Sequence, residues 1–539
     1  MSAVLLVAPV PISAHRTGPA IRYWELARVL SAEQKVTVLA PNADHPIHPQ
    51  FTVCACADGD PRQGKDELDD LLAAHQVIVV QGPGLQRHPR LAQALTAGQH
   101  YLVVDLYDPI TLEQLEIDTV VPALVSSRGR WLNVEYTALL NEQIRLGDFF
   151  LCANERQRGY WLGALAALGR VNQDTYDGSD LRRLIDVVPF GLPAPARPSQ
   201  SEHSAGPVLK GVLPGIAPGD RVVLWGGGLW EWLDPFTPIR AMEQVRTVHP
   251  TARLVFFESA RFQPPIAGQV RQLAADMGLL GREVVFTDWL PPEQWSRCLV
   301  EADVGLSFHP ASIETYFAFR TRLLDYIWAG LPIVTAGGDI LSEQVAACGL
   351  GYVVVPGDAE ALAAALNALL AEPNARQARQ AVFHQVSEQY RWERVAAPLA
   401  RYCREPWHAG DAGRNVYQQW QQAERDRLVA EAANARRQLA EIEAQRQNTA
   451  GVDHADPRQG AEQDRDSQQT AELQAQVDDL ARRLEHSEAQ LQAAMNGRVM
   501  RLMTGMQRAA SRWQRGSRRS PPHAGPLAAG DPSGGDKES

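Results

Sequence analysis

The sequence is poor in cysteine and contains no long hydrophobic run. Its 539 residues include six cysteines, with no CxxC pair and no zinc-site spacing, which argues against a disulfide framework and a structural zinc site. No apolar stretch reaches the roughly 18 residues that a membrane-spanning helix needs. The opening MSAVLLVAPVP lacks a positively charged leader and predicts a buried strand rather than a signal peptide. We therefore expect a cytoplasmic protein with reduced thiols.

Positive charge is also in deficit. The chain has 52 Lys and Arg against 63 Asp and Glu, a formal net charge of −11, so we expect no nucleic-acid partner bound through the overall field of the protein. The hydrophobic content of 45% and the charged content of 21% are ordinary for a globular protein. The length predicts two or three folded units plus extensions.

Short β-branched runs alternate with helical patterns in two regions, residues 1–192 and 219–385. AVLLVAP, KVTVLAP and VIVVQGP are examples in the first, and RVVLWGGG, ARLVFFES and LPIVTAGG in the second. Such alternation predicts α/β domains with doubly wound parallel sheets, and residues 193–218, rich in Pro, Gly and Ser, predict a linker between them. We expect the carboxyl ends of both sheets to face a common cleft, and residues 386–411 to form a closing helix that packs back on the first domain.

The composition changes after residue 412 to Ala, Gln, Glu and Arg. Apolar residues at heptad spacing in 412–446 and 469–494 predict coiled coil, which would support self-association or pairing with a partner helix. The polar stretch 447–468 between them and the tail 520–539 are expected to be disordered.

Residues 495–519, MNGRVMRLMTGMQRAASRWQRGSRR, place apolar side chains and a Trp on one helical face and arginines on the other. This pattern is typical of a helix that lies on an anionic membrane surface, and it would make the protein peripheral on the cytoplasmic membrane. Two alternatives are a partner-binding helix and a disordered basic tail, because Gly497 and Gly505 lower helix propensity.

The stretch SIETYFAFRTRLLDYIWAGLPIV, residues 312–334, concentrates charges at the start of an apolar helix. The first turn of a helix is an anion site, which Arg320 and Arg322 would strengthen. We therefore predict that a diphosphate binds there, with Asp325 accepting hydrogen bonds from ribose hydroxyls. The alternative is an ordinary Arg/Asp surface pair on a packed helix.

HPASIETYFAFRTRLLDYIWAGLPIVTAGGD resembles the donor-site signature of the group 1, or family 4, glycosyltransferases of GT-B fold. It is similar in particular to a bacterial branch associated with surface polysaccharide and O-antigen assembly. The resemblance covers roughly residues 1–405 and includes GPAIRYWELARVL, VVDLYDP, CANERQRGYWLG and VVPFGLP. It implies transfer of a sugar from a nucleotide-diphosphate donor, with retention and without a metal or other cofactor, to a lipid-linked or growing surface glycan.

The resemblance also implies roles for single residues. Asp325 takes the place of the acidic residue that binds ribose, and Arg322 that of a basic residue three positions earlier. Glu314 takes the first acidic role, which faces the donor sugar. The acidic pair is eight residues apart in the family and eleven here, and Phe317 occupies the strict position.

The glycine run after the first strand of the second domain is a further candidate. Relatives carry an Arg and a Lys there, and LWGGGLWEWLDPFTPIRAM has neither. Gly226, Gly227 and Gly228 would still allow close approach of a phosphate, with Arg320 and Arg322 supplying the positive charge. The alternative is a tight turn between strand and helix with no ligand.

The remaining candidates lie in loops. Gly18, at the start of a helix, resembles the family's glycine loop near the phosphates. Asp108 follows Tyr107, which stands where relatives have His; the Asp could contact an acceptor hydroxyl or form an Asp-Pro turn. His309 could bond the donor sugar or be structural.

Trp230 and Trp289 could flank the base or pack in the core. Two other functional classes stay open at this point. One is a catalytically weak GT-B scaffold that recruits partners through its coiled coil, which the missing Arg and Lys favour. The other is a sugar-nucleotide epimerase, which shares the fold.

Overall fold

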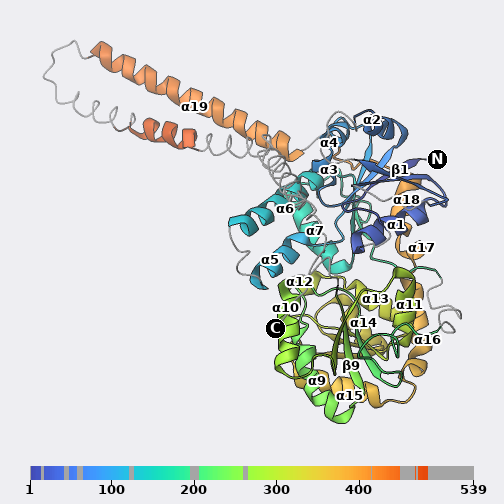
Figure 1. Ribbon diagram of the computed structural model, residues 1–539. Helices are drawn as coiled ribbons and strands as arrows, with labels where there is room; N and C mark the ends of the chain where they lie inside the picture. Colours follow the sequence, from blue (N-terminus) through green and yellow to red (C-terminus); the bar gives the residue numbers. More distant parts are fainter. Residues whose placement is uncertain are drawn as a thin grey trace, which may run out of the picture. The chain divides into compact units, whose positions relative to one another are not determined.

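The structure is a computed structural model that describes residues 2–13, 17–41, 48–56, 65–120, 127–194, 206–258, 265–413, 416–449, 468 and 471–482. The chain divides into two compact units, Met1–Gln419 and Trp420–Ser539. The first unit contains two α/β domains (Figure 1), called here the N-terminal domain (residues 2–194) and the C-terminal domain (residues 206–389).

The N-terminal domain is built on a parallel sheet in the order β3-β2-β1-β4-β5-β6-β7. Its central strands are buried on both faces, which explains why they are continuous apolar runs rather than alternating ones. The strands are β1 (Ala3–Val7), β2 (Lys35–Pro41), β3 (Thr52–Cys56), β4 (Val77–Val80), β5 (Tyr101–Asp105), β6 (Phe149–Cys152) and β7 (Ile185–Val187). The helices are α1 (Gly18–Leu30), α2 (Lys65–Ala74), α3 (Gly84–Arg87), α4 (Pro89–Thr96), α5 (Ile110–Val120), α6 (Ser127–Leu146) and α7 (Glu155–Ala167).

The C-terminal domain repeats the design with a parallel sheet in the order β10-β9-β8-β11-β12-β13. The strands are β8 (Arg221–Trp225), β9 (Ala252–Glu258), β10 (Val284–Asp288), β11 (Val304–Ser307), β12 (Ile333–Ala336) and β13 (Gly351–Val354). The helices are α9 (Phe236–Val248), α10 (Pro265–Asp276), α11 (Pro292–Glu301), α12 (Ile313–Phe317), α13 (Thr321–Ala329), α14 (Ile340–Cys348), α15 (Ala359–Ala371) and α16 (Ala375–Gln389). The order of strands reverses at β1 in one sheet and at β8 in the other, so a ligand is expected beyond the carboxyl ends of these strands.

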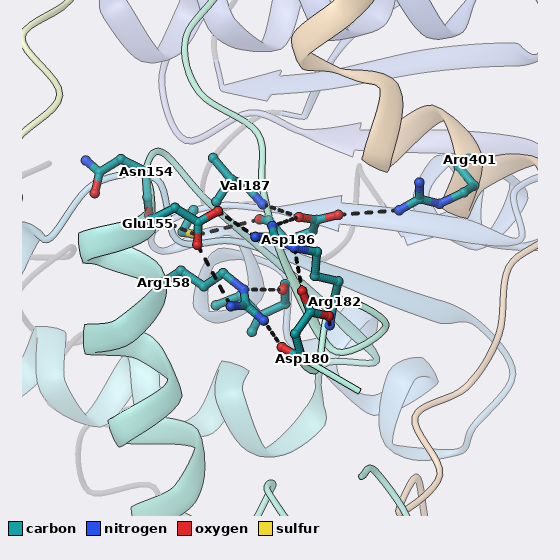
Figure 2. A network of polar contacts seen from close by, with 10 residues as sticks. Asn154, Glu155, Arg158, Asp180, Arg182, Asp186, Val187 and Arg401 are labelled. Carbon is teal, nitrogen blue, oxygen red and sulfur yellow. Dashed lines mark hydrogen bonds and ion pairs between the residues drawn. The ribbon is translucent and has the colours of Figure 1, made fainter. Parts of the chain in front are cut away.

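The segment predicted as one closing helix over 386–411 is instead the end of α16 followed by two short helices, α17 (Trp392–Val395) and α18 (Ala397–Arg404). The buried Trp392 lies against Gly191, where a β-carbon would come within 2.6 Å of the indole. On α18, Arg401 donates to Asp186 at 3.3 Å, within a network that also holds Arg182 and Glu155 (Figure 2). The chain therefore returns from the C-terminal to the N-terminal domain.

Part of the predicted linker is packed structure. Val208, Leu209 and Ile216 are buried, and the Glu301 carboxylate accepts from the backbone N–H groups of Val208, Leu209 and Lys210. Residues 206–218 are thus packed against the C-terminal domain and form part of it.

The second unit contains most of helix α19 (Val416–Thr449) and a helical segment at 471–482. Leu428 and Ala432 of α19 form a buried cluster with Leu480, so the two heptad runs contact each other within one chain, as Figure 1 also shows. The predicted basic helix 495–519 and the tail 520–539 lie outside the described residues. No helix among those described is long and apolar enough to cross a membrane.

Candidate functional site

The glycine run 226–228 forms the turn that leaves β8. The backbone N–H of Gly226 donates to the Tyr326 hydroxyl at 2.6 Å, and a β-carbon on Gly226 would lie 2.9 Å from the Tyr326 ring. This N–H therefore serves a tyrosine rather than a phosphate, contrary to the role predicted for Gly226. Gly227 has φ 127°, a conformation that glycine adopts at low cost, and this opens the turn toward Arg322.

Arg322, in the first turn of α13, lies directly over this turn. Its Nη2 donates to the Gly228 carbonyl at 3.1 Å, and the guanidinium lies 4.8 Å from the centre of the Trp225 ring. Its buried Nη1 has no hydrogen-bond partner among the described residues. Burial lowers the pKa of Arg322 to about 10, because the charged form loses its hydration. An anion between the turn and α13 would restore a partner to this cation.

Asp325 follows one turn later on α13 and is half-buried. Its carboxylate accepts from the Trp295 indole at 3.3 Å, and burial raises its pKa to about 6. Trp289 lies beside Trp295, with ring centres 6.1 Å apart, and is 42% exposed. The exposed ring offers a stacking face beside Trp295, the residue that donates to Asp325. Trp230 instead stacks on Trp232 at 5.1 Å.

Glu314 and Arg320 form a buried ion pair. The two side chains are 1% and 7% exposed, and Arg320 Nη2 also donates to Thr315 Oγ1 at 3.2 Å. Arg320 therefore pairs with Glu314. Contrary to the prediction, its guanidinium is not open to a diphosphate. Its Nε is buried without a partner among the described residues.

His309 is fully buried, which disagrees with the predicted contact to a donor. Its Nε2 lies 3.1 Å from the Asp339 carboxylate, and Asp339 caps α14 by accepting from the N–H groups of Leu341 and Ser342. The hydrogen bond to His309 contributes to a lowered pKa of Asp339 despite its burial. The imidazole thus anchors the β12–α14 turn.

The N-terminal domain contains a buried ion pair between α1 and the end of β5. Arg22 contacts Asp105 through two hydrogen bonds of 2.7 and 2.9 Å, and its guanidinium lies 4.7 Å from the centre of the Tyr107 ring. Gly18 begins α1, and a β-carbon there would lie 3.9 Å from the Tyr107 hydroxyl. The tyrosine that replaces the expected histidine therefore lies at the start of α1.

Asp108 is hydrogen-bonded to Glu113 on α5. Two carboxyl groups bond each other only when a proton lies between them. Burial raises the pKa of Asp108 to about 7 and that of Glu113 well above its usual range, and Glu314 adds negative charge nearby. The pair and Glu314 come from different domains, and their helices α5 and α12 are in contact.

The structure therefore brings together two groups of the predicted residues. Gly227, Gly228 and Arg322 lie together at the end of β8, with Asp325 one turn further along α13. Asp108, Glu314 and Arg320 meet between the domains. Sequence reasoning missed Tyr326, Trp295 and Glu113. The described residues contain no cluster of His, Cys, Asp or Glu that could hold a metal ion.

Comparison with protein families gives a match in the C-terminal domain. Residues 220–372 match the family described as "Glycosyl transferases group 1", and this range includes the glycine turn, Arg322 and Asp325. No curated protein matches the chain.

Solved glycosyltransferase structures share the fold at low identity. The sucrose-phosphate synthase from Thermosynechococcus elongatus is 15% identical with a TM-score of 0.52, over 75% of this chain and 99% of that one. Anabaena HepE, solved with UDP-glucose, is 15% identical with a TM-score of 0.53, over 74% and 99%. WaaG, a glycosyltransferase involved in lipopolysaccharide biosynthesis, is 15% identical with a TM-score of 0.51, over 75% and 100%. The chain thus has a GT-B-like fold with two parallel sheets, and its C-terminal domain carries the match to the group 1 glycosyltransferases.

Proposed function

We propose that this protein is a glycosyltransferase that moves a sugar from a nucleoside-diphosphate donor to a glycan acceptor. The observation that carries the proposal is Arg322, a half-buried cation whose buried Nη1 lacks a partner among the described residues. It lies at the end of β8, where the sheet order reverses and ligands of doubly wound sheets bind.

The surrounding side chains suit the other parts of such a donor. In this proposal the half-buried Asp325 carboxylate would bind ribose hydroxyls, and the exposed Trp289 ring would stack on the base. Anabaena HepE, which shares the fold, has been solved with UDP-glucose, so we propose a nucleotide sugar as the donor class here.

The chemistry follows from the charge of the leaving group. When the glycosidic bond breaks, negative charge develops on the β-phosphate, and the Arg322 guanidinium and the first turn of α13 would stabilise it electrostatically. We propose transfer of a hexose with retention, without a metal or other cofactor, because the cation is supplied by the protein.

The acceptor is proposed to be a lipid-linked or growing surface glycan of a bacterium. In this proposal the acidic body acts at the cytoplasmic face of the membrane, and the basic segment 495–519 holds it there. Vesicle co-sedimentation tests the tether. The full chain should pellet with anionic but not neutral vesicles, and a chain ending at 494 should stay in solution with both.

Equilibrium binding tests the donor site directly. UDP, GDP and ADP, each with and without a hexose, are titrated into the full chain by calorimetry. We expect saturable binding of one nucleotide series. Absence of binding by all of them would contradict the proposal and favour a scaffold that has lost donor binding.

A further inference from the structure

Helix α12, which carries Glu314, has only five residues and depends on contacts at both ends. So short a helix is not stable alone. The Ser312 hydroxyl caps its start by accepting from the Thr315 N–H at 3.1 Å. At the other end the last carbonyls have no partner within the helix, so those of Tyr316 and Phe317 need donors from elsewhere.

These donors come from the N-terminal domain, at the start of α7. Arg156 Nη1 donates to the Tyr316 carbonyl at 3.1 Å. Asn154 Nδ2 and Gln157 Nε2 both donate to the Phe317 carbonyl, at 3.3 and 2.9 Å. A cation at a helix C-terminus is also favoured by the helix dipole.

Both amide side chains are fixed by their oxygens, so their N–H groups are aimed at α12. Asn154 Oδ1 caps α7 by accepting from the Gln157 N–H at 2.8 Å. Gln157 Oε1 accepts from the Ala153 N–H at 2.8 Å. The donors are therefore pre-positioned by the fold of the N-terminal domain.

Arg156 also contacts the β12–α14 turn. Nη1 donates to the Gly338 carbonyl at 2.8 Å, and Nη2 pairs with Glu343 on α14. The guanidinium lies 4.3 Å from the centre of the Tyr316 ring, and the side chain is only 15% exposed. Gly338 precedes Asp339, the partner of His309, so one arginine connects both segments that carry the buried site residues.

We propose that Asn154, Arg156 and Gln157 form a clamp by which the N-terminal domain orders α12 and thereby positions Glu314. They are positioning residues, since they contact α12 and not the donor turn. Glu314 then faces the Asp108–Glu113 pair only while the clamp is engaged. The effect of the clamp on sugar transfer rests on the proposed function, whereas the ordering of α12 does not.

Amide hydrogen exchange on the full chain tests the ordering. The Tyr316 and Ala318 N–H groups bond to the carbonyls of Ser312 and Glu314, so their exchange reports on α12. In Arg156→Ala we expect these amides to exchange about ten- to a hundredfold faster, as the loss of charge-assisted hydrogen bonds implies.

Arg182→Ala is the matched control, because Arg182 pairs with Asp180, Asp186 and Glu155 inside the N-terminal domain (Figure 2). It should leave exchange in α12 at the wild-type rate. Arg156→Lys should be intermediate, since one ammonium cannot replace a guanidinium that bonds two carbonyls and a carboxylate. If circular dichroism shows that Arg156→Ala does not fold, amide exchange in Arg156→Lys tests the ordering of α12 instead.

Binding separates the clamp from the donor site. Whichever of UDP, GDP and ADP the wild type binds best should bind Arg156→Ala within about twofold, while turnover of the corresponding nucleotide sugar falls about tenfold or more. Wild-type exchange at Tyr316 and Ala318 in the Arg156 variants would overturn the clamp. If no nucleotide binds any variant, the proposed function fails, and the exchange rates still decide the clamp.

Discussion

At the residue scale, Arg322 is the side chain on which donor binding should depend most. Arg322→Ala is expected to weaken nucleoside-diphosphate binding about ten- to a hundredfold, because a hydrogen bond to a charged group contributes about 1.5 to 3 kcal/mol. Calorimetric titration measures the change. Folding should survive, since the guanidinium donates only to Gly228 in the part of the chain that the structure describes.

Arg282→Ala is the control for this variant, because Arg282 belongs to the same domain and its side chain is 72% exposed. It should bind the nucleotide like the wild type. Equal affinity in Arg322→Ala and Arg282→Ala would show that the phosphates bind elsewhere.

Asp325 should contribute to the same ligand through its ribose. Asp325→Asn keeps the size and the acceptor for the Trp295 indole but removes the charge, so nucleotide affinity should fall about tenfold or more, as for loss of a charged hydrogen bond. Calorimetry against the same nucleotide measures it. Asp325→Asn and the wild type should have the same affinity for inorganic phosphate, which has no ribose. An unchanged affinity of the variant for the nucleotide would refute the ribose role.

The Asp108–Glu113 pair predicts a dependence of stability on pH. The pKa of both carboxyls is raised in the folded protein, to about 7 for Asp108, so the folded state binds their protons more tightly than the unfolded state. Their contribution to stability is complete below the unfolded values, about pH 4. It is lost as pH rises through about 7 and above.

Glu113→Gln should reverse part of this loss, because the amide still donates to Asp108 but cannot ionise. The difference in Tm between Glu113→Gln and wild type should therefore grow in favour of the variant from pH 5 to 8. Glu67→Gln, on the exposed face of α2, serves as the control. A Tm difference that stays constant over this range would contradict the shared proton. Groups that face the pair are Asp105, Tyr107, Tyr136, Glu314 and Arg320.

At the element scale, most strands were predictable, whereas β3 (Thr52–Cys56) and the break between α16 and α17 were not. Apolar β-branched runs indicated the two parallel sheets because their central strands are buried on both faces. The break between α17 and α18 had a signal in Pro398, which lies in the first turn of α18 and cannot continue a helix, whereas the break between α16 and α17 had no comparable signal. The pairing of Glu314 with Arg320 was also hidden, because it depends on the extended backbone of Ala318, which ends α12. The requirement for Gly226 depends likewise on Tyr326, one hundred residues away.

The heptad pattern predicted an apolar face but could not name its partner. The structure supplies one within the chain, the cluster of Leu428, Ala432 and Leu480. Leu480→Asp should therefore separate the 471–482 helix from α19 and reduce helicity by circular dichroism, because a buried Leu contributes about 1.5 to 3 kcal/mol. Gln476→Asp, at an exposed position of the same helix, should keep the wild-type spectrum, and equal helicity in both variants would rule out the contact.

At the scale of the whole molecule, the heptad segments are still predicted to support association between chains. A chain of residues 1–410 should have a smaller assembly state than the full chain by light scattering, since it lacks both segments. Equal assembly states of the two proteins would reject this prediction. They would indicate that the apolar faces of α19 and the 471–482 helix are buried against each other within one chain.

If the proposed function holds, the C-terminal domain binds a nucleotide-sugar donor that the full chain can use. Incubation of the full chain with a panel of nucleotide sugars radiolabelled in the sugar tests it most directly, because slow release of the label to water reports bond breaking without knowledge of the acceptor. We predict release from one donor, and loss of most of that release in Arg322→Ala. Release from none, or equal release by wild type and Arg322→Ala, would contradict the account.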